Sequence, residues 1–130
     1  MVSRFEDFDI WKDSRELCKD IYRITQFELF NKDFRFRDQI RAAAGSIMDN
    51  IAEGYERNGN KELVQFLYIA KGSCGEVRSQ LYRALDNNYI NQEEFNLLYS
   101  KTLSLSKSTY NLINYLKKSE IDGIKYKKIN

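Results

Sequence analysis

Residues 41–76 constrain the fold of this chain more than any other stretch. Two apolar patterns with helical spacing flank a single breaker, Asn58-Gly59-Asn60. This pattern predicts two antiparallel helices in which positions whose numbers sum to roughly 117 lie at the same height. Glycine inside a helix costs about 1 kcal/mol relative to alanine, so small residues at matching heights predict a close approach of the two backbones. These predicted helix-packing residues are Ala42, Ala43, Gly45, Ser46, Gly72, Ser73 and Gly75.

Helical periodicity continues on both sides of this hairpin. The spacing predicts helices over about residues 8–28, 36–57, 60–86 and 91–118. The chain has 130 residues, 42% of them apolar, and no proline, which suits one domain of long, uninterrupted helices. We therefore expect an all-α fold, an antiparallel up-and-down four-helix bundle over residues 1–119. Residues 120–130 lose the period and are expected to form a basic, partly ordered tail.

A connector is expected between the first two helices. Residues 28–36 lose the helical period but keep four large apolar side chains, which we expect to cap one end of the core: Leu29, Phe30, Phe34 and Phe36. Asn31 or Asp33 could cap a short helical turn inside this connector.

The last predicted helix carries more apolar surface than one seam needs. Besides a regular heptad line, it has a second line of apolar residues. Extra apolar surface of this kind predicts a partner subunit. The residues expected at this oligomer interface are Tyr99, Leu103, Tyr110 and Ile113.

Catalytic chemistry finds little support in the sequence. The chain has no histidine, so it cannot form the Glu-x-x-His pairs of di-iron bundles or activate a nucleophile through imidazole. Glu53 could act as a general base only in a pocket, and it could equally belong to a polar ridge with Asn50 and Arg57. Cys18 and Cys74 are expected to be small core residues rather than a disulfide or a metal site. We expect no enzyme, no cofactor and no metal.

Charge and hydropathy indicate the kind of partner. No charged-then-apolar leader opens the chain, and no apolar run approaches the ~20 residues of a membrane span, so cytoplasmic residence is expected. Lys and Arg exceed Asp and Glu by 21 to 19, and the basic excess falls in residues 34–85 and 117–130. The candidate nucleic-acid-binding residues are Arg37, Arg41, Arg57, Lys61, Lys71, Arg78, Lys117, Lys118, Lys125, Lys127 and Lys128. Arg37 and Arg41 could instead pair with carboxylates such as Asp38 and Glu76.

Several short motifs carry a family resemblance. They are Phe5-Glu6-Asp7-Phe8 with Trp11, Gln39-Ile40-Arg41-Ala42-Ala43 leading to Ser46-Ile47, Asn50-Ile51-Ala52-Glu53-Gly54, and Phe66-Leu67-Tyr68-Ile69-Ala70 with Gly72-Ser73 and Glu76. With these motifs, residues 5–118 resemble the small four-helix-bundle proteins encoded in intervening sequences of bacterial 23S ribosomal RNA genes. The resemblance implies a bundle that assembles as a ring, commonly a homopentamer. The family is also similar to the accessory proteins of diversity-generating retroelements, basic pentameric barrels that bind a reverse transcriptase and nucleic acid.

These observations lead to two functional hypotheses. The first is a non-catalytic, ring-forming bundle that contacts RNA or DNA through backbone charge, since +2 per chain becomes about +10 on five chains. The alternative is a protein interaction scaffold or adaptor that uses the apolar face of the last helix and does not bind nucleic acid.

Overall fold

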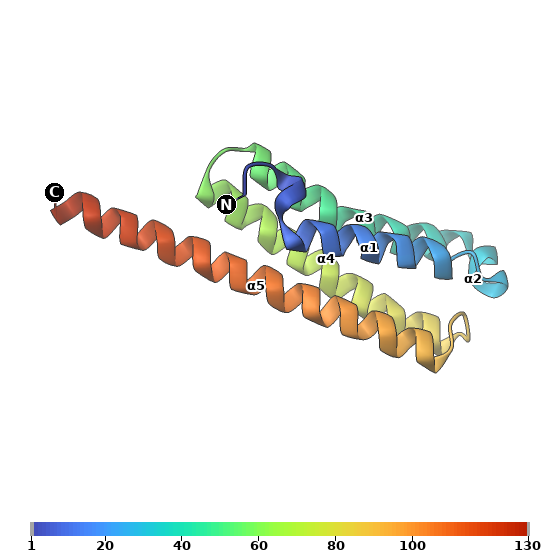
Figure 1. Cartoon of the computed structure of the whole chain (residues 1–130). Coiled ribbons are helices and arrows are strands. Elements are labelled where there is room, and N and C mark those ends of the chain that lie inside the picture. The colour runs from blue at the N-terminus through green and yellow to red at the C-terminus, as the bar shows by residue number, and fades with distance from the viewer. Residues whose placement is uncertain (1, 130) are drawn as a thin grey trace.

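Four long helices and two short ones form the molecule (Figure 1). The computed structural model describes the backbone of residues 2–129 and the side chains of residues 2–119. In chain order the elements are the 3-10 turn η1 (Phe5–Asp7), then α1 (Asp9–Ile24), α2 (Glu28–Lys32), α3 (Phe34–Glu56), α4 (Asn60–Asp86) and α5 (Gln92–Ile129). The prediction of an all-α bundle built on four long helices is confirmed.

The α3–α4 hairpin has close to the predicted register. Asn58 adopts a left-handed conformation with φ 63°, and the extended Gly59 is the N-cap of α4. Halfway along the hairpin the Oγ atoms of Ser46 and Ser73 lie 3.0 Å apart, so one hydroxyl donates to the other. The two positions therefore lie at the same height on facing sides of α3 and α4.

The two helices approach each other closely at a different glycine. A Cβ atom added at Gly54 would lie 2.6 Å from Cβ of Phe66, whereas one added at Gly45, Gly72 or Gly75 would meet nothing within 4 Å. The prediction that these three glycines mediate helix packing is wrong, because periodicity does not tell which side of a helix faces which neighbour. Ala43 is buried as expected of a packing residue, whereas Ala42 is exposed. 

The connector covers one end of the core with half of its apolar residues. The Phe30 and Phe36 rings are buried and stacked 5.2 Å apart, and both pack on Tyr89. Leu29 and Phe34 remain 54% and 65% exposed, so their predicted role in the core is wrong. They lie on the side of α2 and of the first turn of α3 that is turned away from the core.

Asp33 holds this end together through two hydrogen bonds. Its carboxylate accepts from the backbone N–H of Phe36 at 3.2 Å, as an N-cap of α3, and from the Tyr89 hydroxyl at 2.7 Å. These hydrogen bonds, that of Tyr89 first, lower the pKa of Asp33. One carboxylate therefore joins α3 to the turn before α5.

Ion pairs join the first and last helices. Arg23 on α1 donates two hydrogen bonds to Glu94 on α5, at 2.8 and 2.9 Å, and Lys101 donates to Asp20 at 2.7 Å. The bond from Arg23 is the main cause of the lowered pKa of Glu94. These pairs fix the position of α5 against α1 at the end where α5 begins.

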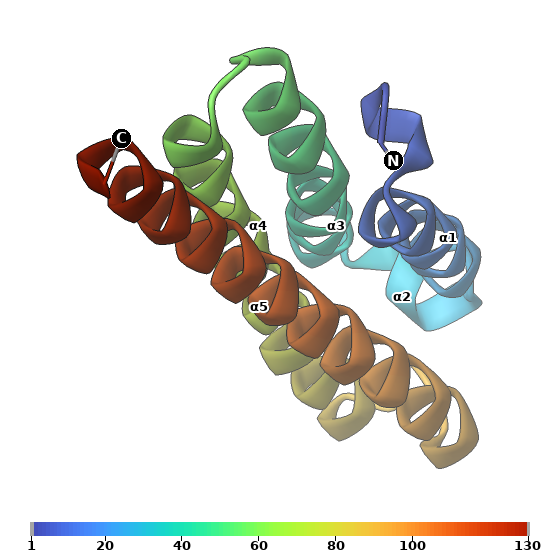
Figure 2. The ribbon, with the colours of Figure 1, turned by 60° about the vertical axis from the view of Figure 1, so that its left-hand side comes forward.

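α5 is longer than the sequence indicates. Its backbone stays helical to Ile129, beyond the predicted end near Lys118, and its last turns project past the other helices (Figures 1 and 2). The predicted tail of residues 120–130 falls in this region, and its side chains lie outside the described residues. No helix in the described part of the chain combines the length and apolar character that crossing a bilayer requires.

Candidate nucleic-acid interface

One face of the molecule, formed by α4 and α5, combines cations with aromatic rings. Helical spacing on α4 places Tyr68, Lys71, Gly72, Gly75 and Arg78 along the side that borders α5. From α5 come Ser106, Lys107, Tyr110 and Lys117. We call the surface made by these nine residues the basic face.

This face contains cations without carboxylates. Residues 63–75 and 95–119 include no Asp or Glu, although they include Lys71, Lys107 and Lys117. Like charges that are not neutralised by neighbours raise the positive potential of a concave surface. The basic face is thus electrostatically suited to an anion.

Lysines and tyrosines on the basic face are paired. Lys71 Nζ lies 5.8 Å from the centre of the Tyr110 ring, and Lys117 Nζ lies 5.6 Å from that of Tyr68. Lys117 also donates a hydrogen bond of 3.3 Å to the Tyr68 hydroxyl. Both rings remain close to half exposed, at 45% for Tyr68 and 48% for Tyr110. Each ring is therefore held beside an ammonium group while part of its surface stays open to a ligand.

The basic face is hollowed at its middle. A pocket of about 400 Å³ is lined by Tyr68, Lys71, Gly72, Gly75, Arg78, Ser106 and Tyr110, and we call it the Arg78 pocket. A smaller hollow of about 220 Å³ shares Lys71, Ser106 and Tyr110 with it and adds Lys107. No carboxylate lines either hollow.

Arg78 is the most unusual side chain of the pocket. Its Nη1 atom is buried and has no hydrogen-bond partner among the described residues. A buried charged donor without an acceptor is costly, and polar atoms of this kind are satisfied in most native structures. Together with Lys71, this guanidinium can bind an oxyanion such as a phosphate.

Two predicted arginines lie elsewhere and are engaged within the chain. Arg41 Nε donates to the Thr25 hydroxyl at 2.8 Å, and its guanidinium covers the Tyr22 ring at 4.4 Å. Arg37 Nε donates to Asp38 at 3.1 Å, while its Nη1 donates to the Asn31 side chain at 3.0 Å. Of the two carboxylate pairings considered, the pairing of Arg37 with Asp38 is present, whereas Arg41 packs against α1 instead of Glu76.

The remaining predicted cations are not among the residues that define the basic face. Arg57 pairs with Glu53 at 3.0 Å, and Lys61 and Lys118 are exposed. Lys125, Lys127 and Lys128 lie outside the described side chains. The structure thus brings together Lys71, Arg78 and Lys117 from the predicted set.

Lys107 belongs to the basic face but is absent from the predicted set. Its charge is isolated in the sequence, so it adds to no local basic cluster. The signal that could have identified it is the absence of carboxylates from residues 95–119, together with its position three residues before Tyr110.

The four residues expected at an oligomer interface have different environments. Ile113 is fully buried in the core of this chain, so it cannot contact a second copy directly. Tyr99 and Leu103 are partly buried, and the Tyr99 ring stacks on Phe95 at 5.6 Å. Tyr110 is on the basic face. Of the predicted residues only Tyr110 is an exposed large apolar side chain, and Leu97 and Tyr115 add further exposed apolar surface on α5.

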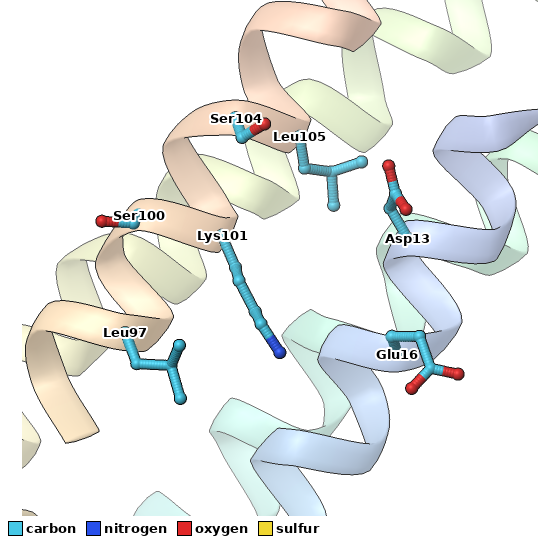
Figure 3. Close-up of a pocket in the computed structure, with 7 residues that line it drawn as sticks. All are labelled: Asp13, Glu16, Leu97, Ser100, Lys101, Ser104 and Leu105. Atoms are coloured by element: carbon cyan, nitrogen blue, oxygen red, sulfur yellow. The ribbon is translucent and has the colours of Figure 1, made fainter.

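A second cleft, of mixed charge, lies between α1 and α5. Figure 3 shows Asp13 and Glu16 on α1 facing Leu97, Lys101 and Leu105 on α5, around a volume of about 470 Å³. Lys101 is already bonded to Asp20, and Glu16 is paired with Lys19 at 3.1 Å. This cleft is larger than the Arg78 pocket, but its opposite charges and its apolar floor suit an amphipathic protein segment better than a polyanion.

Neither cysteine is placed for chemistry. Cys74 is buried and its Sγ donates to the Thr102 carbonyl at 3.0 Å, whereas Cys18 Sγ contacts Met48 Sδ at 3.5 Å. Burial raises the pKa of each thiol to about 11. Within the described residues, no three His, Cys, Asp or Glu side chains are grouped to hold a metal ion.

The fold and the basic face define a class: an all-α, antiparallel four-helix bundle protein with one cationic, aromatic side. A family model described as 23S rRNA-intervening sequence protein matches residues 6–111. The chain therefore belongs to the family of 23S rRNA-intervening sequence proteins.

A solved structure supports the fold. The chain is similar, with a TM-score of 0.74 and 24% identity, to a protein of unknown function from the S23 ribosomal protein family of Bacteroides thetaiotaomicron. The alignment covers 80% of this chain and 97% of the other. No curated protein matches the chain. The similarity to accessory proteins of diversity-generating retroelements stays a prediction.

Proposed function

We propose that this protein is a non-catalytic, oligomeric bundle that associates with nucleic acid, in particular RNA, through the basic face. The observation that carries the proposal is the gathering of Lys71, Arg78, Lys107 and Lys117 on the basic face, whose two hollows are lined by no carboxylate. These cations lie in two rows, one on α4 and one on α5. Such rows suit the repeating phosphates of a nucleic-acid backbone. Membership in the 23S rRNA-intervening sequence family adds support for an RNA-associated role.

Assembly would strengthen weak individual contacts. A single chain carries a net charge of only +2. If copies of the basic face are displayed around a ring, several contacts form at once and the effective affinity rises far above that of one face. The exposed apolar residues of α5, such as Leu97 and Tyr115, supply surface on which copies could associate.

Binding of a structured RNA as a function of salt tests the proposal. We expect binding at about 50 mM salt that weakens steeply toward about 200 mM, because counterions are released from the phosphates. The variant K71A/K117A should reduce the slope of log affinity against log salt by about one per lysine.

A matched control removes the same charge elsewhere. In K12A/K32A two exposed lysines of α1 and α2 are replaced, and the slope should stay close to that of the unmodified chain. Absence of RNA binding at low salt, or an affinity that does not change with salt, would contradict the proposal.

The α1–α5 cleft favours a second candidate function, that of a protein adaptor. Its apolar floor at Leu105 and its acidic wall of Asp13 and Glu16 suit an amphipathic segment with basic residues. In this case the variant L97E should abolish capture of the protein partner, and K71A/K117A should have no effect on it.

A further inference from the structure

The Arg78 pocket differs from a merely basic surface in three respects. It is concave, it is lined by an arginine whose buried Nη1 atom has no acceptor, and two helical glycines, Gly72 and Gly75, belong to its lining. Contact with a polyanion through long lysines on a surface needs none of these features, because ammonium groups reach phosphates without a pocket.

The two glycines of the lining have no explanation within the chain. Gly72 and Gly75 lie in the interior of α4, where each costs about 1 kcal/mol of helix stability relative to alanine. A Cβ at either position would meet nothing within 4 Å, so packing inside the chain does not require glycine there. Gly54, by contrast, is required by its contact with Phe66. Glycine in the lining of an open pocket is consistent with close approach of an external group.

The lining indicates the chemistry of that group. Arg78 and Lys71 supply two cations, and the pocket has no carboxylate to neutralise them. The half-exposed rings of Tyr68 and Tyr110 add flat apolar surface to the same cavity. A planar base next to a phosphate satisfies both kinds of lining at once, since bases stack on aromatic side chains and phosphates bind guanidinium groups.

We propose that the Arg78 pocket binds one nucleotide of a single-stranded RNA segment, with the phosphate on Arg78 and Lys71 and the base against Tyr68 or Tyr110. This inference rests on the proposed function and adds which form of RNA is bound and where. The bases of a duplex are stacked within the helix and cannot reach the tyrosines, so single strands are preferred. The tyrosine rings can stack on any base because every base has a π-face, so we expect a weak sequence preference.

Fluorescence anisotropy with a labelled oligouridine of about ten nucleotides tests the inference. In R78M the side chain keeps its approximate length but loses its charge, and we expect about tenfold weaker binding or more, because a charge-assisted hydrogen bond is lost. In G72A/G75A two methyl groups are added to the pocket lining, and we expect weaker binding together with a higher melting temperature, because alanine favours the helix.

Gly45 provides the matched control. It lies on α3, away from the pocket lining, and a Cβ there also meets nothing within 4 Å. G45A should therefore raise the melting temperature and leave the affinity for oligouridine unchanged. If Gly72 and Gly75 had only a structural role, G72A/G75A would behave like G45A and would raise the melting temperature without weakening the binding of oligouridine.

The outcomes distinguish this inference from the proposed function. If the unmodified chain binds no RNA, both fail. If it binds RNA with the expected salt dependence and K71A/K117A weakens binding, but R78M and G72A/G75A do not, only the pocket inference fails. Equal affinity for the same strand annealed to its complement would also overturn it. Competition by uridine monophosphate as effective as that of the strand would assign the pocket to a free nucleotide instead and overturn binding of a strand.

Discussion

Gly54 has a role opposite to that of Gly45, Gly72 and Gly75, although all four lie in helices. Gly54 lets α3 approach α4, because any side chain there would lie 2.6 Å from Cβ of Phe66 and 3.2 Å from Cδ1 of Leu63. Gly45, Gly72 and Gly75 face open space. The effect of replacing a helical glycine therefore depends on whether a neighbouring helix occupies the space that the methyl group would enter.

The substitution G54A should show this difference. An exposed helix interior gains up to about 1 kcal/mol when glycine becomes alanine, but here we expect a net loss of about 1–3 kcal/mol from overpacking. Urea denaturation of G54A and G45A measures both effects, and G45A should be more stable than the unmodified chain. A stabilised G54A would contradict the close approach of α3 and α4.

The thiols of Cys18 and Cys74 should both be unreactive in the folded chain. Because burial raises the pKa of Cys18 and Cys74 to about 11, only a very small fraction of either thiol is ionised at pH 8. We expect a thiol-exchange reagent to react slowly with the folded chain at pH 8 and rapidly after unfolding in urea. Fast labelling of Cys74 in the folded chain would show that α4 and α5 separate readily.

At the scale of elements, two ion pairs join the start of α5 to α1, beside the apolar core that both helices share. Glu94 has a lowered pKa, so its pairing with Arg23 contributes stability above the usual carboxyl pKa of 4.5. That contribution is lost as the pH falls through the lower pKa of the folded state. It is modest, because Arg23 and Glu94 are 43% and 23% exposed.

The variant E94Q tests this pairing. We expect it to be less stable than the unmodified chain by about 0.5–1 kcal/mol at pH 7, the range measured for exposed pairs with good geometry. The difference should shrink as the pH falls below the usual carboxyl pKa of 4.5 and through the lower pKa of Glu94 in the folded chain. Thermal melts of both chains over pH 3–7 measure it. A difference that does not change with pH would mean that Glu94 acts through packing alone.

Much of this element arrangement could be predicted from the sequence. Apolar periodicity located four long helices, and the breaker at Asn58-Gly59-Asn60 placed the turn well enough for Ser46 to meet Ser73. The faces of each helix were harder to assign. Arg41 turns to Thr25 on α1 rather than to Glu76, because a residue's height on a helix does not specify its direction around the axis.

The candidate site could be predicted only in part for the same reason. Lys71, Arg78 and Lys117 were expected among the nucleic-acid-binding residues, but their gathering with Tyr68 and Tyr110 depends on how α5 packs across α4. Lys107 has no basic neighbour in the sequence and becomes part of the face only in three dimensions. The small residues of α4 were expected to contact α3, whereas Gly72 and Gly75 line a pocket on the α5 side.

At the scale of the whole molecule, the exposed apolar residues of α5 and its neighbours favour association of copies. Light scattering should give a mass several times the 15.4 kDa of one chain. We expect the variant L103E, which puts a charge on the partly buried leucine between Tyr99 and Lys107, to lower this mass. L29E is the control, since Leu29 is exposed on α2. A monomer before any substitution would remove the argument for a ring.

The absence of carboxylates from residues 95–119 also affects how the protein behaves during purification. All 19 acidic side chains lie outside residues 63–75 and 95–119, so the charge is distributed unevenly over the molecule. At pH 8.5, where the sequence has no net charge, the chain should still be retained by a cation-exchange resin, with the basic face turned toward the matrix. Adsorption would thus orient the molecule rather than merely concentrate it.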